Sequence, residues 1–321
     1  MNQYQTIMAI VPSKAEATPA LERAVELARA SGAALHLCVF EYDSSVALAA
    51  ARVGAEVAAH VRHDIVRDSQ ERLERLALSL AGKGNVIECD VVWSPDEADA
   101  VLAKALDIDA QLVVKDAHHE SALRRTIFTP LDWKLMRLLP CELMLVGPDL
   151  RSKPKRVAAA IDVWGEPASV DGLNQRIIDA ALLLAEYLNA RLDLVSVFPY
   201  FPSYSHRAWP SSKAIYAEAN DAHQQAFVDF SAAHNIPEDR RHRPAGQATA
   251  ELVRFVKDNH IDVLVAGTTY RGGWDRLLLG RTVETVAQEI GADLLLVKPA
   301  AFLDVLKEHV DLSKLKTGYR N

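Results

Sequence analysis

The sequence of 321 residues predicts an α/β fold made of two tandem doubly wound domains, each with a five-stranded parallel sheet. Short apolar segments of strand length alternate with helical patterns of ten or more residues. This alternation requires crossover connections, which make the strands parallel and place helices on both faces of the sheet. In addition, segment 262–299 has a weaker copy at 109–148, with the same spacing of strand and helix. The duplication predicts two domains that share one topology.

In the first repeat, strand-like residues 6–11 are followed by an amphipathic helix over 19–31 that Gly32 ends. A second strand is expected at 34–40, then a polar helical stretch, and a third strand near 86–92.

The second repeat follows the same order. We expect strands at 157–161 and 191–198, a helix over 174–188 between them, and a third strand near 240–243. A last helical pattern covers 302–315. The predicted boundaries are a first domain over 1–148, a second over 156–300 and a C-terminal tail over 301–321.

Composition narrows the classes of function. The formal net charge of −7 repels phosphate backbones, so general nucleic acid binding is not expected. The three cysteines have no metal or redox spacing, and no leader pattern or long apolar run stands in the sequence. These features predict a cytoplasmic protein without a membrane partner.

The segment from Asp262 onward predicts an anion site. Its strand leads into a loop with glycines and then a helix, whose first N–H groups can bind phosphate. Ligands of doubly wound sheets bind beyond the carboxyl ends of the strands. This rule places Asp162 beside loop 267–282 in the second repeat, and Pro12 beside loop 115–130 in the first.

These residues resemble the universal stress protein family, whose nucleotide-binding members carry Gly, two residues, Gly, nine residues, Gly and then Ser or Thr. Gly267 and Gly280 match the first and last glycines, and Asp162 matches an aspartate near the base or ribose. The two copies, with IFTPLDW in the first and GRTVE in the second, are most similar to E-type tandem members. The resemblance implies a role in survival under stress such as DNA damage, by binding without turnover.

Two positions depart from the pattern of the family. Tyr270 replaces the second glycine and modifies the site, and Arg281 replaces the hydroxyl residue, although Thr282 follows. The candidate nucleotide-binding residues are therefore Asp162, Gly267, Gly280, Arg281 and Thr282. An alternative role for Asp162 is to cap the segment that follows it.

The first repeat is degenerate. Pro12 takes the position of Asp162, Lys115 takes that of Gly267, and no glycine remains in the loop. Thr129 and Asp132 around a proline predict a helix capped by its own side chains, in place of an anion.

Three other groups of residues have a functional and a structural reading. His118, His119 and Glu120 suggest a metal site or a solvated loop, and we expect no metal. Arginine-rich segment 239–243 is a binding patch or a polar turn. Aromatic segment 198–210 covers an apolar ligand or packs on the sheet.

No catalytic motif emerges, so no enzyme is expected. The favoured function is a stress protein that acts by binding. The alternatives are an ATP or AMP sensor that uses the second domain only, and a carrier of an apolar small molecule. No cofactor is required, and ATP or AMP is the candidate ligand of the second domain. The duplication predicts a pseudo-dimer within one chain, either monomeric or paired as a homodimer.

Overall fold

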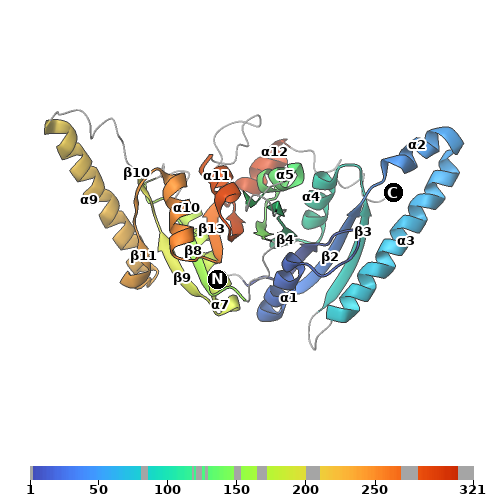
Figure 1. Cartoon of the computed structure of the whole chain (residues 1–321), viewed down its shortest axis with the longest axis horizontal. Coiled ribbons are helices and arrows are strands. Elements are labelled where there is room, and N and C mark those ends of the chain that lie inside the picture. Colours follow the sequence, from blue (N-terminus) through green and yellow to red (C-terminus); the bar gives the residue numbers. More distant parts are fainter. Residues whose placement is uncertain are drawn as a thin grey trace. The chain divides into compact units, whose positions relative to one another are not determined.

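The computed structural model describes residues 3–80, 86–117, 119–120, 125–126, 129–147, 153–164, 172–199, 210–268 and 281–309. The chain forms two compact units (Figure 1). One contains most of residues 2–150 and helix α12 (Phe302–His309), and the other contains residues 151–300 and strand β6 (Arg125–Thr126). We refer to them as the first and the second domain.

In the first domain, described strands form a parallel sheet in the order β7-β4-β1-β2-β3. Its elements are β1 (Thr6–Ile10), α1 (Pro19–Ser31), β2 (Ala34–Glu41), α2 (Ser44–Val53), α3 (Ala55–Leu80), β3 (Ile87–Trp93), α4 (Glu97–Asp107), β4 (Leu112–Asp116), α5 (Pro130–Leu138) and β7 (Glu142–Val146). The short strand β5 (His119–Glu120) lies at a point where the chain passes from the first unit to the second.

The second domain repeats this topology in the strand order β14-β13-β8-β9-β11. Its elements are β8 (Arg156–Ala160), α7 (Leu173–Leu188), β9 (Arg191–Val195), β10 (Phe198–Pro199), α9 (Pro210–Ala233), the 3-10 turn η1 (Glu238–Arg240), β11 (Arg241–His242), β12 (Ala245–Gly246), α10 (Ala248–Asp258), β13 (Val263–Gly267), α11 (Arg281–Glu289) and β14 (Asp293–Val297). Strands β10 and β12 form a separate parallel pair.

Local sequence explains the boundaries of the first helix. The Thr18 side chain accepts a hydrogen bond from Leu21 N, and Pro19 occupies the first turn, where its missing N–H costs nothing. The helix ends at Gly32, whose φ of 74° is left-handed. The range predicted for this helix is confirmed.

Other predicted ranges are confirmed to within a few residues, with two differences. The strand expected at 191–198 ends at Val195, and Phe198 belongs to the separate β10–β12 pair. The strand expected at 240–243 is reduced to Arg241–His242, because residues 238–240 form the 3-10 turn. Described residues of the C-terminal helix end at His309.

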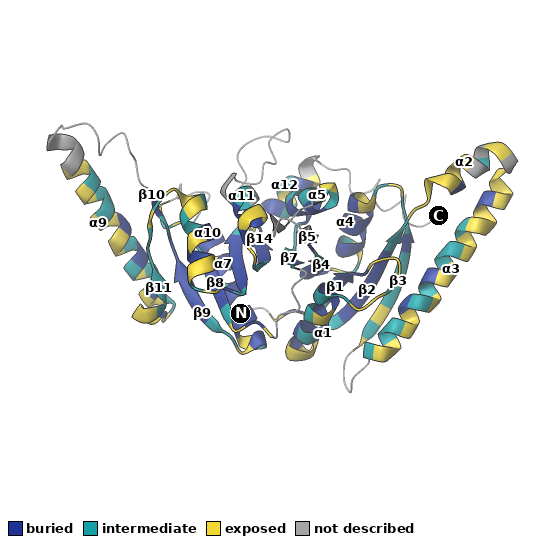
Figure 2. Cartoon of the chain, in the orientation of Figure 1, coloured by how far each residue is buried: buried dark blue, intermediate teal, exposed yellow. Residues whose placement is uncertain are grey.

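Many of the most deeply buried residues of each domain lie on its central strands. Ile7, Leu35 and Val113 of the first sheet and Val157 and Leu264 of the second are completely buried. Figure 2 shows the contrast between these buried strands and helices α3 and α9, which alternate buried and exposed residues. None of the helices in the described ranges is long and apolar enough to span a membrane. The fold matches the predicted class, two tandem α/β domains with parallel sheets.

Candidate functional site

Asp162 and Gly267 lie at the same edge of the second sheet. Strands β8 and β13 are parallel neighbours, with Ala160 opposite Ala266. Asp162 follows the end of β8 by two residues, and Gly267 is the last residue of β13. The structure therefore brings these two predicted site residues together at the carboxyl edge, where doubly wound sheets bind ligands.

The main chain and side chain of Asp162 have separate partners. The Asn174 amide accepts a hydrogen bond from Asp162 N at 3.1 Å and donates one to Asp162 O at 2.8 Å. The exposed Asp162 carboxylate accepts a hydrogen bond from Trp164 N through Oδ1 at 2.9 Å. Asp162 thus caps the following turn, and its carboxylate also keeps acceptor capacity at the surface.

Close packing explains the glycine at position 267. A Cβ atom there would lie 2.8 Å from Leu173 Cγ and Cδ2 and from Ile177 Cδ1. Leu173 and Ile177 belong to the first turns of α7, so this glycine lets α7 approach the end of β13.

The strand registers correct the equivalence that we predicted between the repeats. In the first sheet Lys115 lies opposite Leu145 and Asp116 opposite Val146, whereas in the second Gly267 lies opposite Val297. Glu142 and Asp293 are the first residues of the closing strands β7 and β14, so the two registers can be compared directly. The counterpart of Gly267 is therefore Asp116, and the predicted match with Lys115 was wrong by one residue. The two neighbours point to opposite faces of the strand.

Asp116 and Lys115 have different partners on those two faces. Asp116 Oδ1 accepts a hydrogen bond from Ala20 N in the first turn of α1, at 3.0 Å. The Lys115 ammonium lies 2.8 Å from Asp132 Oδ1 in α5 and donates to Asp116 O at 3.0 Å. The first domain thus has internal polar contacts at this edge of its sheet.

Helix α5 of the first domain has a complete side-chain cap, as predicted. Thr129 Oγ1 accepts a hydrogen bond from Asp132 N at 3.2 Å, and Asp132 Oδ2 accepts one from Thr129 N at 2.7 Å. This reciprocal pair is a capping box, and Asp132 is completely buried within it. An anion at this helix end would meet a buried carboxylate.

The equivalent helix end in the second domain has a different sequence. Counted back from the closing strands, Gly280 matches Thr129 and Val283 matches Asp132, so neither half of a capping box is present. Arg281 and Thr282 open α11. The side chains of these two residues, all of Gly280 and the site-modifying Tyr270 lie outside the described residues.

Aromatic rings surround His223 near Asp162. The ring centroid of His223 lies 5.7 Å from that of Trp164 and 5.2 Å from that of Phe198, and Phe198 also contacts Tyr216. His223 is completely buried, and neither ring nitrogen has a hydrogen-bond partner in the described part of the chain. Burial lowers the pKa of His223, as does nearby Arg243, while Asp162 acts in the opposite sense. The imidazole is therefore neutral at pH 7.

Arg241 and Arg243 of the arginine-rich segment 239–243 make structural contacts. Arg241 Nε donates to Ile236 O at 2.7 Å, and Arg243 donates to Asn220 Oδ1 at 2.9 Å and lies over the Phe198 ring. Within the described ranges, no three His, Cys, Asp or Glu side chains are grouped as a metal site requires. His118 lies outside those ranges.

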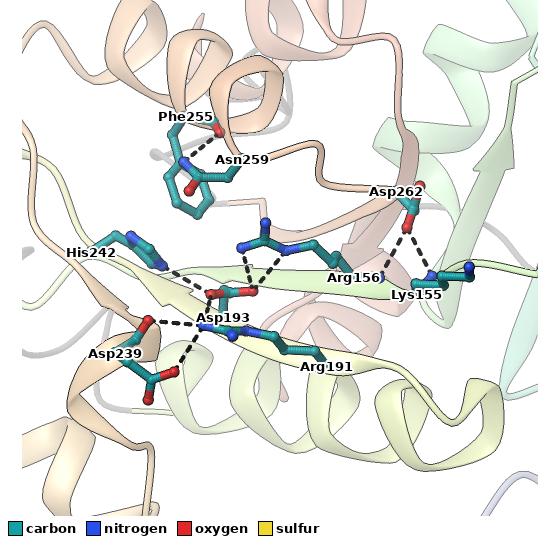
Figure 3. Close-up of polar contacts among 9 residues, drawn as sticks. All are labelled: Lys155, Arg156, Arg191, Asp193, Asp239, His242, Phe255, Asn259 and Asp262. Carbon is teal, nitrogen blue, oxygen red and sulfur yellow. Dashed lines mark hydrogen bonds and ion pairs between the residues drawn. The ribbon is translucent and has the colours of Figure 1, made fainter.

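An ion-pair network joins Arg156 and Arg191, the first residues of β8 and β9, to Asp193 in the middle of β9 (Figure 3). Asp193 is completely buried and accepts hydrogen bonds from Arg156 at 3.1 Å, Arg191 at 3.4 Å and His242 at 3.0 Å. Burial acts to raise the Asp193 pKa, but the hydrogen bond from His242 and the two guanidinium groups outweigh it and lower that pKa. Arg191 also pairs with Asp239 at 3.2 Å. These partners all belong to the same domain, which is typical of a network that stabilises the fold.

Sequence reasoning did not identify Asn174, His223 or Asp116 as residues of the ligand edge. Asn174 lies twelve residues after Asp162, and His223 lies within α9, so no local motif joins them to the strand ends. The signal for Asp116 was available, because aligning the closing strands residue by residue gives the correct register.

Comparisons with known proteins agree with this duplicated architecture. Two segments of the chain, residues 3–147 and 155–298, match the universal stress protein family. Universal stress protein E homolog of Haemophilus influenzae is 26% identical over 306 residues, which cover 93% of this chain and 98% of that protein. Universal stress protein E of Escherichia coli K12 is 26% identical over 302 residues, which cover 93% of this chain and 95% of that protein.

Solved structures give the same fold. A protein of Pseudomonas aeruginosa UCBPP-PA14, named as a universal stress protein, has a TM-score of 0.72 and 24% identity, covering 95% of this chain and 97% of that chain. A second Pseudomonas aeruginosa protein, from strain PAO1 and of unknown function, has a TM-score of 0.71 and 24% identity, covering 97% of this chain and 98% of that one. With both halves matched in tandem, the chain belongs to the universal stress protein family.

Proposed function

We propose that this chain supports survival under stress such as DNA damage by binding a small molecule in the cytoplasm, without turnover. We further propose that the ligand is an adenine nucleotide, ATP or AMP, and that only the second domain binds it. The observation that carries the proposal is the difference between the two helix ends. In the first domain Thr129 and Asp132 cap α5, whereas Gly280 and Val283 stand at the matching positions.

Electrostatics favours phosphate in the second domain alone. The first N–H groups of a helix attract anions when no side chain caps them. In the first domain these groups meet the buried Asp132 carboxylate, whose charge Lys115 balances at 2.8 Å. In the second domain Arg281 adds a positive charge to the first turn of α11, and arginine can hold phosphate with two hydrogen bonds.

In this proposal Asp162 binds the sugar or the base of the nucleotide, at the end away from the phosphates. Its carboxylate is exposed at the end of β8, and the Asn174 amide holds its main chain in place. Oδ1 accepts one hydrogen bond from Trp164 N, which leaves acceptor capacity for a ribose hydroxyl or an amino group.

Isothermal titration calorimetry of the full chain with ATP and with AMP tests the proposal. The informative variant is Gly280→Thr with Val283→Asp, which installs the cap of the first domain in the second. We expect it to weaken binding at least tenfold, or about 1.4 kcal/mol, because a carboxylate replaces the phosphate. Asp162→Ala is expected to weaken binding, while the matched control Asp43→Ala is not.

Asp43 is a suitable control because it makes the same local contact away from this edge. Its exposed Oδ1 accepts from Ser45 N at 2.8 Å, as that of Asp162 does from Trp164 N. Absence of heat with millimolar nucleotide would refute the nucleotide proposal. A strain that lacks the chain, complemented with the wild type or the double variant and exposed to a DNA-damaging agent, tests whether binding supports survival.

A second candidate function is carriage of an apolar small molecule by the aromatic rings around His223. Its support is the buried imidazole without a hydrogen-bond partner in the described ranges, between Trp164 and Phe198. Native mass spectrometry of gently extracted protein tests this function. A copurified apolar molecule that His223→Leu no longer retains would support it, and bare protein would count against it.

A further inference from the structure

The first domain contains a cavity that is separate from the ligand edge discussed above. It has a volume of about 570 Å³ and lies between α2, α3 and the ends of β2 and β3. Figure 1 shows α2 and α3 as a helical hairpin beside β3. Gly54 joins the two helices with a φ of 106°, which other residues rarely adopt. The volume lies in the range of small-molecule sites, about 300–1,000 Å³.

One face of α3 explains why this space is not filled. Ser69 and Leu73 of this face are buried, and Ser69 Oγ donates to Glu41 Oε1 at 2.7 Å. Toward the start of α3 the same face continues as the alanines at 55, 58 and 59, which line the cavity. Because alanine side chains are short, they leave the space between this face of α3 and Val46 and Ala47 of α2 unfilled.

Two aromatic rings complete the cavity wall. Tyr42 and Trp93 lie just after β2 and at the end of β3, with ring centroids 5.8 Å apart. The Arg62 guanidinium carbon lies 5.9 Å from the Trp93 ring centroid. Tyr42 remains 44% exposed, so solvent reaches this side of the cavity.

Two basic residues of α3 line the cavity. Arg62 is half-buried and His63 is exposed. No carboxylate lines the described cavity. Apolar walls with nitrogen donors at one place suit a molecule with an apolar body and one negative group.

We propose that the α2–α3 cavity binds a small amphipathic anion, an aliphatic chain that ends in a carboxylate. The chain lies against the alanine face of α3 and the residues of α2, and the carboxylate binds Arg62 beside His63. The site does not depend on the nucleotide proposal, because it uses other elements of the other domain. The alternative is that Arg62 packs its stem and guanidinium over Trp93 in a structural role.

Calorimetry with decanoate, below its micelle-forming concentration, tests the proposal on the full chain. We expect one decanoate per chain and weaker binding of decanol, which lacks the charge. Arg62→Gln is expected to weaken decanoate binding at least tenfold, because the carboxylate loses its positively charged hydrogen-bond donor. The matched control is Arg67→Gln, because Arg67 lies on α3 outside the cavity and is exposed; we expect it to change binding less than twofold.

Two further measurements locate the site. A brominated decanoate is expected to quench tryptophan fluorescence in the wild type, and Trp93→Phe is expected to remove most of that quenching. Ala59→Phe is expected to fill the cavity and abolish binding while the circular dichroism spectrum stays unchanged. The proposal is overturned by absence of binding, by equal effects of the Arg62 and Arg67 variants, or by quenching that persists without Trp93.

Discussion

Lys115 Nζ and Asp132 Oδ1 lie 2.8 Å apart inside the first domain, and both side chains are almost fully buried. The second domain has Ala266 and Val283 at the matching positions of strand and helix. A charged pair in one domain thus corresponds to two small or apolar residues in the other. The first domain neutralises the start of α5 with its own side chains. We therefore expect an external anion to bind at the corresponding helix of the second domain.

Loss of the Lys115 charge is expected to destabilise the first domain strongly. Lys115→Met keeps most of the side-chain volume but leaves the Asp132 carboxylate buried without its cation, at a cost of about 3–5 kcal/mol. Urea unfolding followed by circular dichroism measures the change. The control is Lys134→Met, which removes the exposed pair with Asp96 at 3.0 Å and is expected to cost less than about 1 kcal/mol. Equal costs would show that the buried pair has no special role.

A methyl group at position 267 is expected to disturb the packing of α7. In Gly267→Ala the new Cβ would lie 2.8 Å from atoms of Leu173 and Ile177, and overpacking of this kind costs about 1–3 kcal/mol. Gly291→Ala is the control, because a Cβ there has no neighbour within 4 Å. We expect that control to be neutral or slightly stabilising. A stable Gly267→Ala protein would refute the packing explanation for this glycine.

The network around Asp193 predicts that stability decreases in acid. A folded-state pKa below the unfolded value of about 3.9 adds stability above that pH, and this stability is lost as the pH falls through the folded pKa. Asp193→Asn is expected to lower the stability at pH 7 by about 1.5–3 kcal/mol and to flatten its decrease between pH 5 and 3. Urea midpoints across this range measure both effects. The control Asp258→Asn, at an exposed site, is expected to keep the wild-type slope.

His223 predicts a second effect of pH, nearer neutrality. Its folded-state pKa is lowered, so the unfolded chain binds the proton more readily and the folded state loses stability as pH falls through about 6.5. His223→Phe keeps a ring between Trp164 and Phe198 and removes two buried nitrogens, so we expect little change at pH 7 and a smaller loss at pH 5. Thermal unfolding at both values tests this prediction. The exposed His60→Phe is the control, and an unchanged loss in His223→Phe would contradict our account.

Prediction from sequence succeeded where the information is local. The helix over residues 19–31 and its two ends follow from Thr18, Pro19 and Gly32, and the cap of α5 follows from Thr129 and Asp132. The alternation of short apolar segments with helical patterns located the strands. Each of these features depends on residues within one or two turns of chain, so a single sequence contains the whole signal.

Prediction failed where residues distant in the chain meet. The match of Asp116 with Gly267 was missed although an alignment of the closing strands gives it, and the register of β4 against β7 shows it directly. The contacts of Asn174 with Asp162, of His223 with Trp164 and of Arg62 with Trp93 each join different elements. Their partners become neighbours only when the sheet and its helices pack.

The sequence by itself determined the duplicated α/β fold, the family resemblance and the loss of the glycines from the first repeat, because periodicity and spacing are written along the chain. Tertiary structure decided how each domain uses its charges. It joined Lys115 to the Asp132 cap and gathered Arg156, Arg191 and His242 around Asp193. It also left a cavity beside the alanine face of α3. The physical reason is that burial and electrostatic pairing depend on distances in space, which the order of residues does not specify.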